Sequence, residues 1–236
     1  MAVFESPIVY SMIARDALIV LPLRWKKEMD TTYLREEERV ALRRQPRVTK
    51  PVIDQLHSIL EDGVLRPITQ ELSSASHHFV QPGKDELTLK IVDAMNAGMA
   101  AWSSQAGAAQ RIGSLGQIAH RVIDAWSPFS VLGDDEQATM FRERFMADLA
   151  LHIGAMPFLW EFRDHSTDVK AAVASTPFDT ADMIRIHMDR RADVITPIAN
   201  GYLCGNGYPA IEGELRDWYN RMVNCVAKVW LHCVMR

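Results

Sequence analysis

Apolar residues recur at intervals of three and four along most of the chain, which is the period of amphipathic helices. No stretch alternates apolar and polar residues for long enough to predict a strand. The spacing predicts helices over residues 5–24, 52–60, 85–110, 114–126, 136–153, 181–196 and 211–234. We therefore expect an all-α fold, a multi-helix bundle that forms a single domain over residues 1–236.

Glycine, proline and capping residues indicate where these helices end. Gly63 is expected to close the second helix, a break is expected near Gly113, and Pro128 is expected to stop the helix before it. Residues 64–86, 154–180 and 201–213 are rich in turn-forming residues and read as loops. The highly charged stretch 25–50 is either a solvated or mobile segment or a patch that binds phosphate or lipid headgroups.

Composition narrows the class of protein. The chain has 236 residues, of which 48% are hydrophobic and 24% charged, as in an ordinary globular protein. A net charge of -4 argues against a general nucleic-acid binder. No apolar run is long enough to span a membrane, and the three cysteines form neither a CxxC pair nor a disulfide framework. We expect a cytoplasmic protein with reduced thiols.

The candidate chemistry lies on the helix before Pro128. His120 and Asp124 are four residues apart, so they stand on one face of that helix. An imidazole and a carboxylate placed in this way can hold one metal ion, or they can simply pair with each other inside the bundle.

The residues around this pair resemble the signature of zinc-dependent phospholipase C and the related single-strand-specific zinc nucleases, which are all-α enzymes with three buried zinc ions. The signature has a histidine, an aspartate four residues later, a proline and a final histidine. In this chain His120, Asp124 and Pro128 match the first three positions, and Ser130 stands where the family has the final histidine. Upstream, a family histidine before a phenylalanine matches His77-His78-Phe79, and the resemblance selects His78. The residues alone leave open which of these two histidines points inward.

The chain also departs from the family pattern at several ligand positions. Glu143 is similar to a family glutamate, but Thr139 stands where the family has a histidine, and Tyr10 replaces another. The implied ligand set is therefore one divalent metal on His78, His120 and Asp124, with zinc preferred and with iron or manganese also suited to these ligands.

The resemblance implies catalytic roles for Glu143 and Asp124, with Glu143 as the remaining candidate base. The same correspondence predicts a substrate pocket lined by Tyr10, Phe79, Trp126, Phe129, Ser130 and Thr139.

Three functions are compatible with these residues. The leading hypothesis is a one-metal hydrolase that cleaves a phosphoester or related bond of a small intracellular molecule. The alternative is a repurposed scaffold that promotes cyclisation, isomerisation or elimination of an apolar, natural-product-like metabolite, because tyrosine, threonine and serine replace three ligands and make the pocket less polar. The third is a binding module without catalysis.

Overall fold

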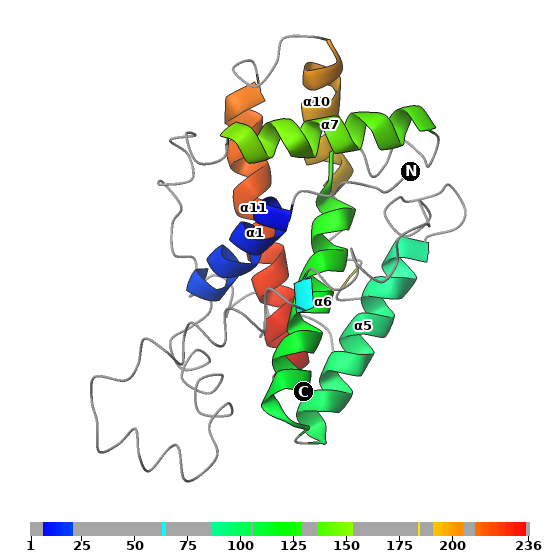
Figure 1. Cartoon of the computed structure of the whole chain (residues 1–236), viewed down its shortest axis with the longest axis vertical. Coiled ribbons are helices and arrows are strands. Elements are labelled where there is room, and N and C mark those ends of the chain that lie inside the picture. Colours follow the sequence, from blue (N-terminus) through cyan, green and yellow to red (C-terminus); the bar gives the residue numbers. More distant parts are fainter. Residues whose placement is uncertain are drawn as a thin grey trace, which may run out of the picture.

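The computed structural model describes residues 7–20, 63–64, 86–104, 106–128, 136–152, 184, 191–204 and 211–234. Helices run through these ranges in the order α1 (Pro7–Val20), α5 (Glu86–Ser103), α6 (Ala108–Trp126), α7 (Glu136–His152), α10 (Arg191–Leu203) and α11 (Glu212–Val234) (Figure 1). No strand occurs among the described residues, so the all-α prediction is confirmed. None of the described helices is long and apolar enough to cross a membrane.

The helices are arranged around α11 and α6. These two run along the long axis of the molecule, α5 lies beside α6, and α7 lies across one end (Figure 1). α11 packs against α1, α5, α6 and α10. This central position fits its sequence, because the run from Val229 to Cys233 is buried on every side of the helix.

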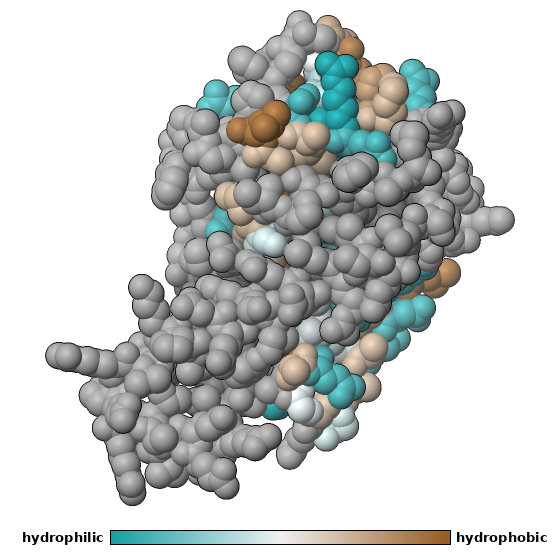
Figure 2. All heavy atoms as spheres, viewed as in Figure 1, coloured by the Kyte–Doolittle hydropathy of each residue, from teal (hydrophilic) through white to brown (hydrophobic). Residues whose placement is uncertain are grey.

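The outward face of α11 carries charged side chains, as expected for an amphipathic segment, and Glu214, Asp217 and Arg221 are exposed there. On the face shown in Figure 2, hydrophobic surface of the described residues appears at the end of the molecule near α7 and again near α5. The large hydrophobic side chains that stay exposed among the described residues are Leu89, Met140, Leu151 and Leu203.

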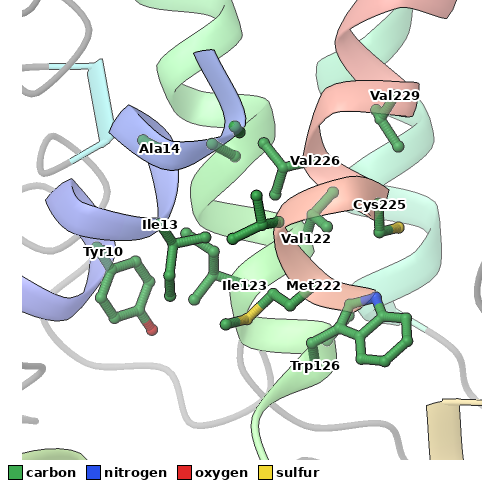
Figure 3. Close-up of a cluster of buried hydrophobic side chains, with 14 of the residues drawn as sticks. Tyr10, Ile13, Ala14, Val122, Ile123, Trp126, Met222, Cys225, Val226 and Val229 are labelled. Atoms are coloured by element: carbon green, nitrogen blue, oxygen red, sulfur yellow. The ribbon is translucent and has the colours of Figure 1, made fainter. Parts of the chain in front are cut away.

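The inward faces of α1, α6 and α11 meet in the core. Ile13, Val122 and Met222 represent the three helices there, and each is completely buried (Figure 3). Burying one such side chain contributes about 1.5–3 kcal/mol. Two buried tryptophans of α11 also hold it to α6, because the indole N–H of Trp218 donates to the Trp126 carbonyl at 2.6 Å and that of Trp230 to the Leu115 carbonyl at 2.8 Å.

The helix pair α5–α6 differs from the prediction at its turn. The expected break near Gly113 is wrong, because the chain leaves α5 at Ser103 and α6 begins at Ala108. Gly113 lies inside α6, where Gly63 packs directly on it. A Cβ atom on Gly63 would lie only 2.5 Å from the Gly113 carbonyl oxygen. We conclude that the absence of a side chain at Gly63 permits this close backbone packing, whereas a Cβ atom on Gly113 would meet nothing within 4 Å.

The segment before α11 also differs from the prediction. α10 runs through Pro197 and on to Leu203, whereas the sequence predicted a loop from Gly201. A Cβ on Gly201 would lie 2.5 Å from a methyl group of Ile211, so this glycine makes room for the residue just before α11. The predicted helix over 52–60, the charged stretch 25–50 and the loop 154–180 lie outside the described residues.

Candidate functional site

The predicted pair on α6 forms the centre of a buried polar site. His120 and Asp124 are both 0% exposed. The Nε2 atom of His120 lies 3.3 Å from Oδ2 of Asp124. One helical turn separates the two residues, so the backbone of α6 alone brings these side chains together.

α1 contributes a tyrosine to this pair. The Tyr10 hydroxyl donates a hydrogen bond of 2.5 Å to Oδ1 of Asp124, although the two residues are 114 positions apart. The Tyr10 ring stacks on the His120 ring, with centroids 4.9 Å apart and planes inclined by 26°. Tyr10 therefore holds both members of the pair, through its hydroxyl and through its ring.

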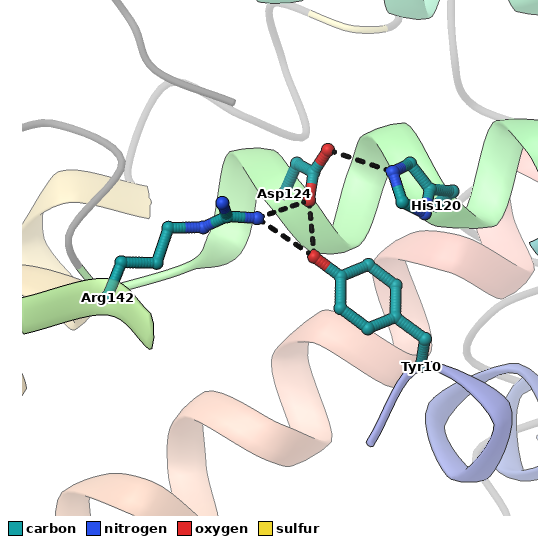
Figure 4. A network of polar contacts seen from close by, with 4 residues as sticks. All are labelled: Tyr10, His120, Asp124 and Arg142. Carbon is teal, nitrogen blue, oxygen red and sulfur yellow. Dashed lines mark hydrogen bonds and ion pairs between the residues drawn. The ribbon is translucent and has the colours of Figure 1, made fainter. Parts of the chain in front are cut away.

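α7 contributes a cation. Nη2 of Arg142 donates to Oδ1 of Asp124 and to the Tyr10 hydroxyl oxygen, each at 3.0 Å (Figure 4). Its side chain is only 2% exposed. Tyr10, His120, Asp124 and Arg142 thus form one contact group, which we call the buried tetrad.

The charges of the buried tetrad balance. The guanidinium of Arg142 and the carboxylate of Asp124 are opposite charges in direct contact, and both are shielded from water. Desolvating each ion costs several kcal/mol, and their attraction offsets this cost when the geometry is good. The Tyr10 oxygen connects the two because it donates to the carboxylate and accepts from the guanidinium.

Arg142 is the member that the sequence interpretation missed. On α7 Phe141 is only partly buried, whereas the neighbouring Arg142 is buried and takes an inner position. Arg142, Phe145, Met146 and Leu149 follow the i, i+3, i+4, i+7 spacing of a buried stripe. An arginine at the first position of such a stripe was the available signal, because it requires a buried anionic partner.

The other predicted site residues are placed as follows. Glu143, the expected base, is half-buried on α7, and a helical step of about 100° turns it away from the direction of Arg142. Trp126 is buried in the core beside Cys225 (Figure 3). Thr139 lies in α7, but its side chain is not among those described. The predicted residues outside the described ranges are His78, Phe79, Phe129 and Ser130.

The described residues alone do not make a metal site. They contain no group of three or more histidine, cysteine, aspartate or glutamate side chains that could hold an ion. His120 and Asp124 face each other, and a guanidinium already contacts the carboxylate. The predicted set of His78, His120 and Asp124 stays a prediction, since His78 lies outside the described residues.

An open hollow of about 340 Å³ lies between α10 and α11. It is lined by Asp193, Val194, Pro197, Glu214, Asp217 and Arg221. None of these residues belongs to the buried tetrad, so this hollow is a separate surface feature.

Comparison of the chain with known protein families, with curated proteins and with solved structures gives no match. The resemblance to zinc-dependent phospholipase C and the zinc nucleases thus stays a prediction that rests on the residues quoted for it.

Proposed function

We propose that the chain is an enzyme that performs acid–base chemistry on a small apolar molecule, with the buried tetrad as its catalytic centre. The observation that carries this proposal is the convergence of a phenol, a carboxylate, an imidazole and a guanidinium from α1, α6 and α7, joined at 2.5–3.3 Å. The reaction class is isomerisation, cyclisation or elimination, which requires a proton given at one position and taken at another.

Each member has a role that its contacts support. Tyr10 donates its hydroxyl proton to the substrate, and the guanidinium 3.0 Å from its oxygen stabilises the resulting phenolate. Asp124 accepts a proton from a second position of the substrate and passes it to Tyr10 along their 2.5 Å hydrogen bond. One proton enters the substrate and one leaves it, so an isomerisation returns the centre to its starting state. His120 orients Asp124 through the contact to Oδ2.

The burial of the tetrad restricts the kind of substrate that can reach it. All four side chains are at most 2% exposed, so the substrate has to displace packed side chains to reach Tyr10. Excluding water strengthens the electrostatic contacts of the reacting groups. An apolar substrate fits this setting, because the surroundings in α1, α6 and α11 are aliphatic and aromatic (Figure 3).

The test is turnover of a fractionated apolar metabolite extract, followed by mass spectrometry in light and heavy water. We expect the parent protein to generate product that carries solvent deuterium and to do so after treatment with a chelator. Tyr10→Phe should abolish this product. Tyr219→Phe is the matched control, because Tyr219 is equally buried and donates a 2.5 Å hydrogen bond to Asp16 outside the tetrad. Full turnover by Tyr10→Phe, or equal loss in both variants, would contradict the proposal.

The one-metal hydrolase is the second candidate. The closeness of His120 and Asp124 on one face of α6 favours it, because such a pair supplies two of the three ligands. It requires Asp124 to exchange its guanidinium partner for the metal and His78 to complete the set. Loss of activity on chelation, with activity on phosphoesters instead of apolar metabolites, would select this candidate.

A further inference from the structure

The hydroxyl of Ser127 is a buried polar group that does not belong to the buried tetrad. Ser127 follows directly on the last residue of α6 and is only 2% exposed. In the part of the chain that the structure describes, its Oγ atom has no hydrogen-bond partner. A hydroxyl that is shielded from water costs free energy unless a partner satisfies it. We propose that Ser127 anchors the substrate by donating a hydrogen bond to a substrate oxygen.

The backbone of α6 places Ser127 on the face that carries the tetrad. The φ angle of Ser127 is -59°, as in a helix, and its backbone N–H donates to the Asp124 carbonyl at 3.0 Å. The Cβ atom of Ser127 therefore takes the next helical position, and the chain leaves the helix only after it. His120, Asp124 and Ser127 follow intervals of four and three, so their side chains are neighbours on one face of α6.

Aromatic side chains connect this end of α6 with the inner face of α7. The indole N–H of Trp218 donates to the carbonyl of Trp126, the residue directly before Ser127. Phe145 lies edge-on to Trp218, with ring centroids 6.0 Å apart, and it follows Arg142 by one helical turn. An apolar molecule that carries a hydrogen-bond acceptor suits these surroundings, because the rings offer contacts to its carbon skeleton and the hydroxyl satisfies its oxygen.

This inference rests on the proposed function and narrows its substrate to an apolar carbonyl compound. A carbonyl oxygen accepts the hydrogen bond from Ser127 and also acidifies a neighbouring C–H group. The proton of that group passes to Asp124, while the C–H electron pair moves towards the carbonyl oxygen. Tyr10 then returns one proton at a second carbon, which restores the carbonyl and completes an isomerisation.

Urea denaturation without a ligand tests whether the Ser127 hydroxyl has a structural role. Ser127→Ala should leave the denaturation midpoint unchanged or raise it, because no hydrogen bond is lost. Tyr219→Phe is the matched control, since it also removes a single hydroxyl from a buried residue, but this hydroxyl donates to Asp16 at 2.5 Å. The control should lower the midpoint. An equal fall in Ser127→Ala would overturn the inference, because the hydroxyl would then have a partner within the protein.

Equilibrium dialysis with cyclohexanone and with methylenecyclohexane tests the substrate class. The two probes have similar shapes, but only the ketone has an oxygen acceptor. Ser127→Ala should bind cyclohexanone about three- to tenfold more weakly than the parent, which is the effect of one hydrogen bond, and should bind methylenecyclohexane equally well. Ser114→Ala should bind both probes like the parent, because the Ser114 hydroxyl already donates to the Arg111 carbonyl at 2.7 Å.

The dialysis separates this inference from the proposed function, because it involves no turnover. Equal cyclohexanone affinities of the parent and Ser127→Ala, or no cyclohexanone binding by the parent, would overturn the role of Ser127. If Tyr10→Phe still abolished turnover in that case, the proposed function would stand without a Ser127 anchor. A selective loss of cyclohexanone binding in Ser127→Ala, together with full turnover by Tyr10→Phe, would support the anchor and contradict the proposed chemistry.

Discussion

Replacing Arg142 by methionine removes the cation from a carboxylate that is completely buried. The guanidinium Nη2 lies 3.0 Å from Oδ1 of Asp124, and the two side chains are 2% and 0% exposed. At an effective dielectric constant of about 20, two unit charges at this distance attract by roughly 5 kcal/mol. Breaking a buried pair by removing one partner costs about 3–5 kcal/mol, because the remaining charge stays desolvated. We therefore expect Arg142→Met to lower the free energy of unfolding by about 3–5 kcal/mol.

The assay is urea denaturation followed by far-UV circular dichroism. Arg221→Met is the matched control, since Arg221 pairs with Asp217 at 2.8 Å while both side chains are more than half exposed. The control should cost less than about 1 kcal/mol. Adding Asp124→Asn to Arg142→Met should recover part of the loss, because no buried charge then remains. An Arg142→Met cost no larger than that of the control, or no recovery in the double variant, would refute this account of the buried tetrad.

Three further predictions concern packing, thiols and pH. Gly63→Ala should destabilise the protein by about 1–3 kcal/mol, because its Cβ atom would lie 2.5 Å from the Gly113 carbonyl oxygen. Gly113→Ala, whose Cβ atom would enter open space, should stabilise α6 by up to about 1 kcal/mol, and chemical denaturation measures the free energy of unfolding of both variants. A thiol reagent near neutral pH should label Cys204 alone, since burial raises the pKa of the two thiols on α11 to about 11 and about 12, and labelling of all three would contradict their burial. Burial and the hydrogen bond to Asp148 raise the pKa of Tyr202 to about 12, so the folded chain holds this proton more tightly than the unfolded chain, whose tyrosines ionise near pH 10. This contribution to stability is complete below about pH 10 and is lost as the pH rises towards 12, and Tyr202→Phe should flatten that loss in thermal melts at rising pH.

Local spacing predicted much of the fold. The recurrence of apolar residues located α7 and α11 to within about a residue at each end. It also placed His120 and Asp124 on one face of α6, because positions four apart in a helix are neighbours whatever surrounds them. These successes share a physical cause, since each depends only on residues within a few turns of one another.

The errors come from contacts between distant segments. Gly113 was predicted as a break because glycine weakens an isolated helix, but the structure uses it as the place where Gly63 approaches. Arg142 reaches Asp124 across 18 positions and from a different helix, so no local pattern connects them. The hydrogen bond from Tyr10 to Asp124 was missed because it depends on how α1 crosses α6, which helical periodicity does not specify. The assignment of Tyr10 to a substrate pocket stays a prediction.

Elemental analysis is the most direct test of whether the buried tetrad works as an acid–base centre without a metal. The protein should be purified without chelators and without a metal-affinity tag, and measured beside His120→Ala. Our account predicts no stoichiometric zinc, iron or manganese in either protein while the parent remains folded and active. One equivalent of metal in the parent that is absent from His120→Ala would contradict it and would establish His120 as a metal ligand.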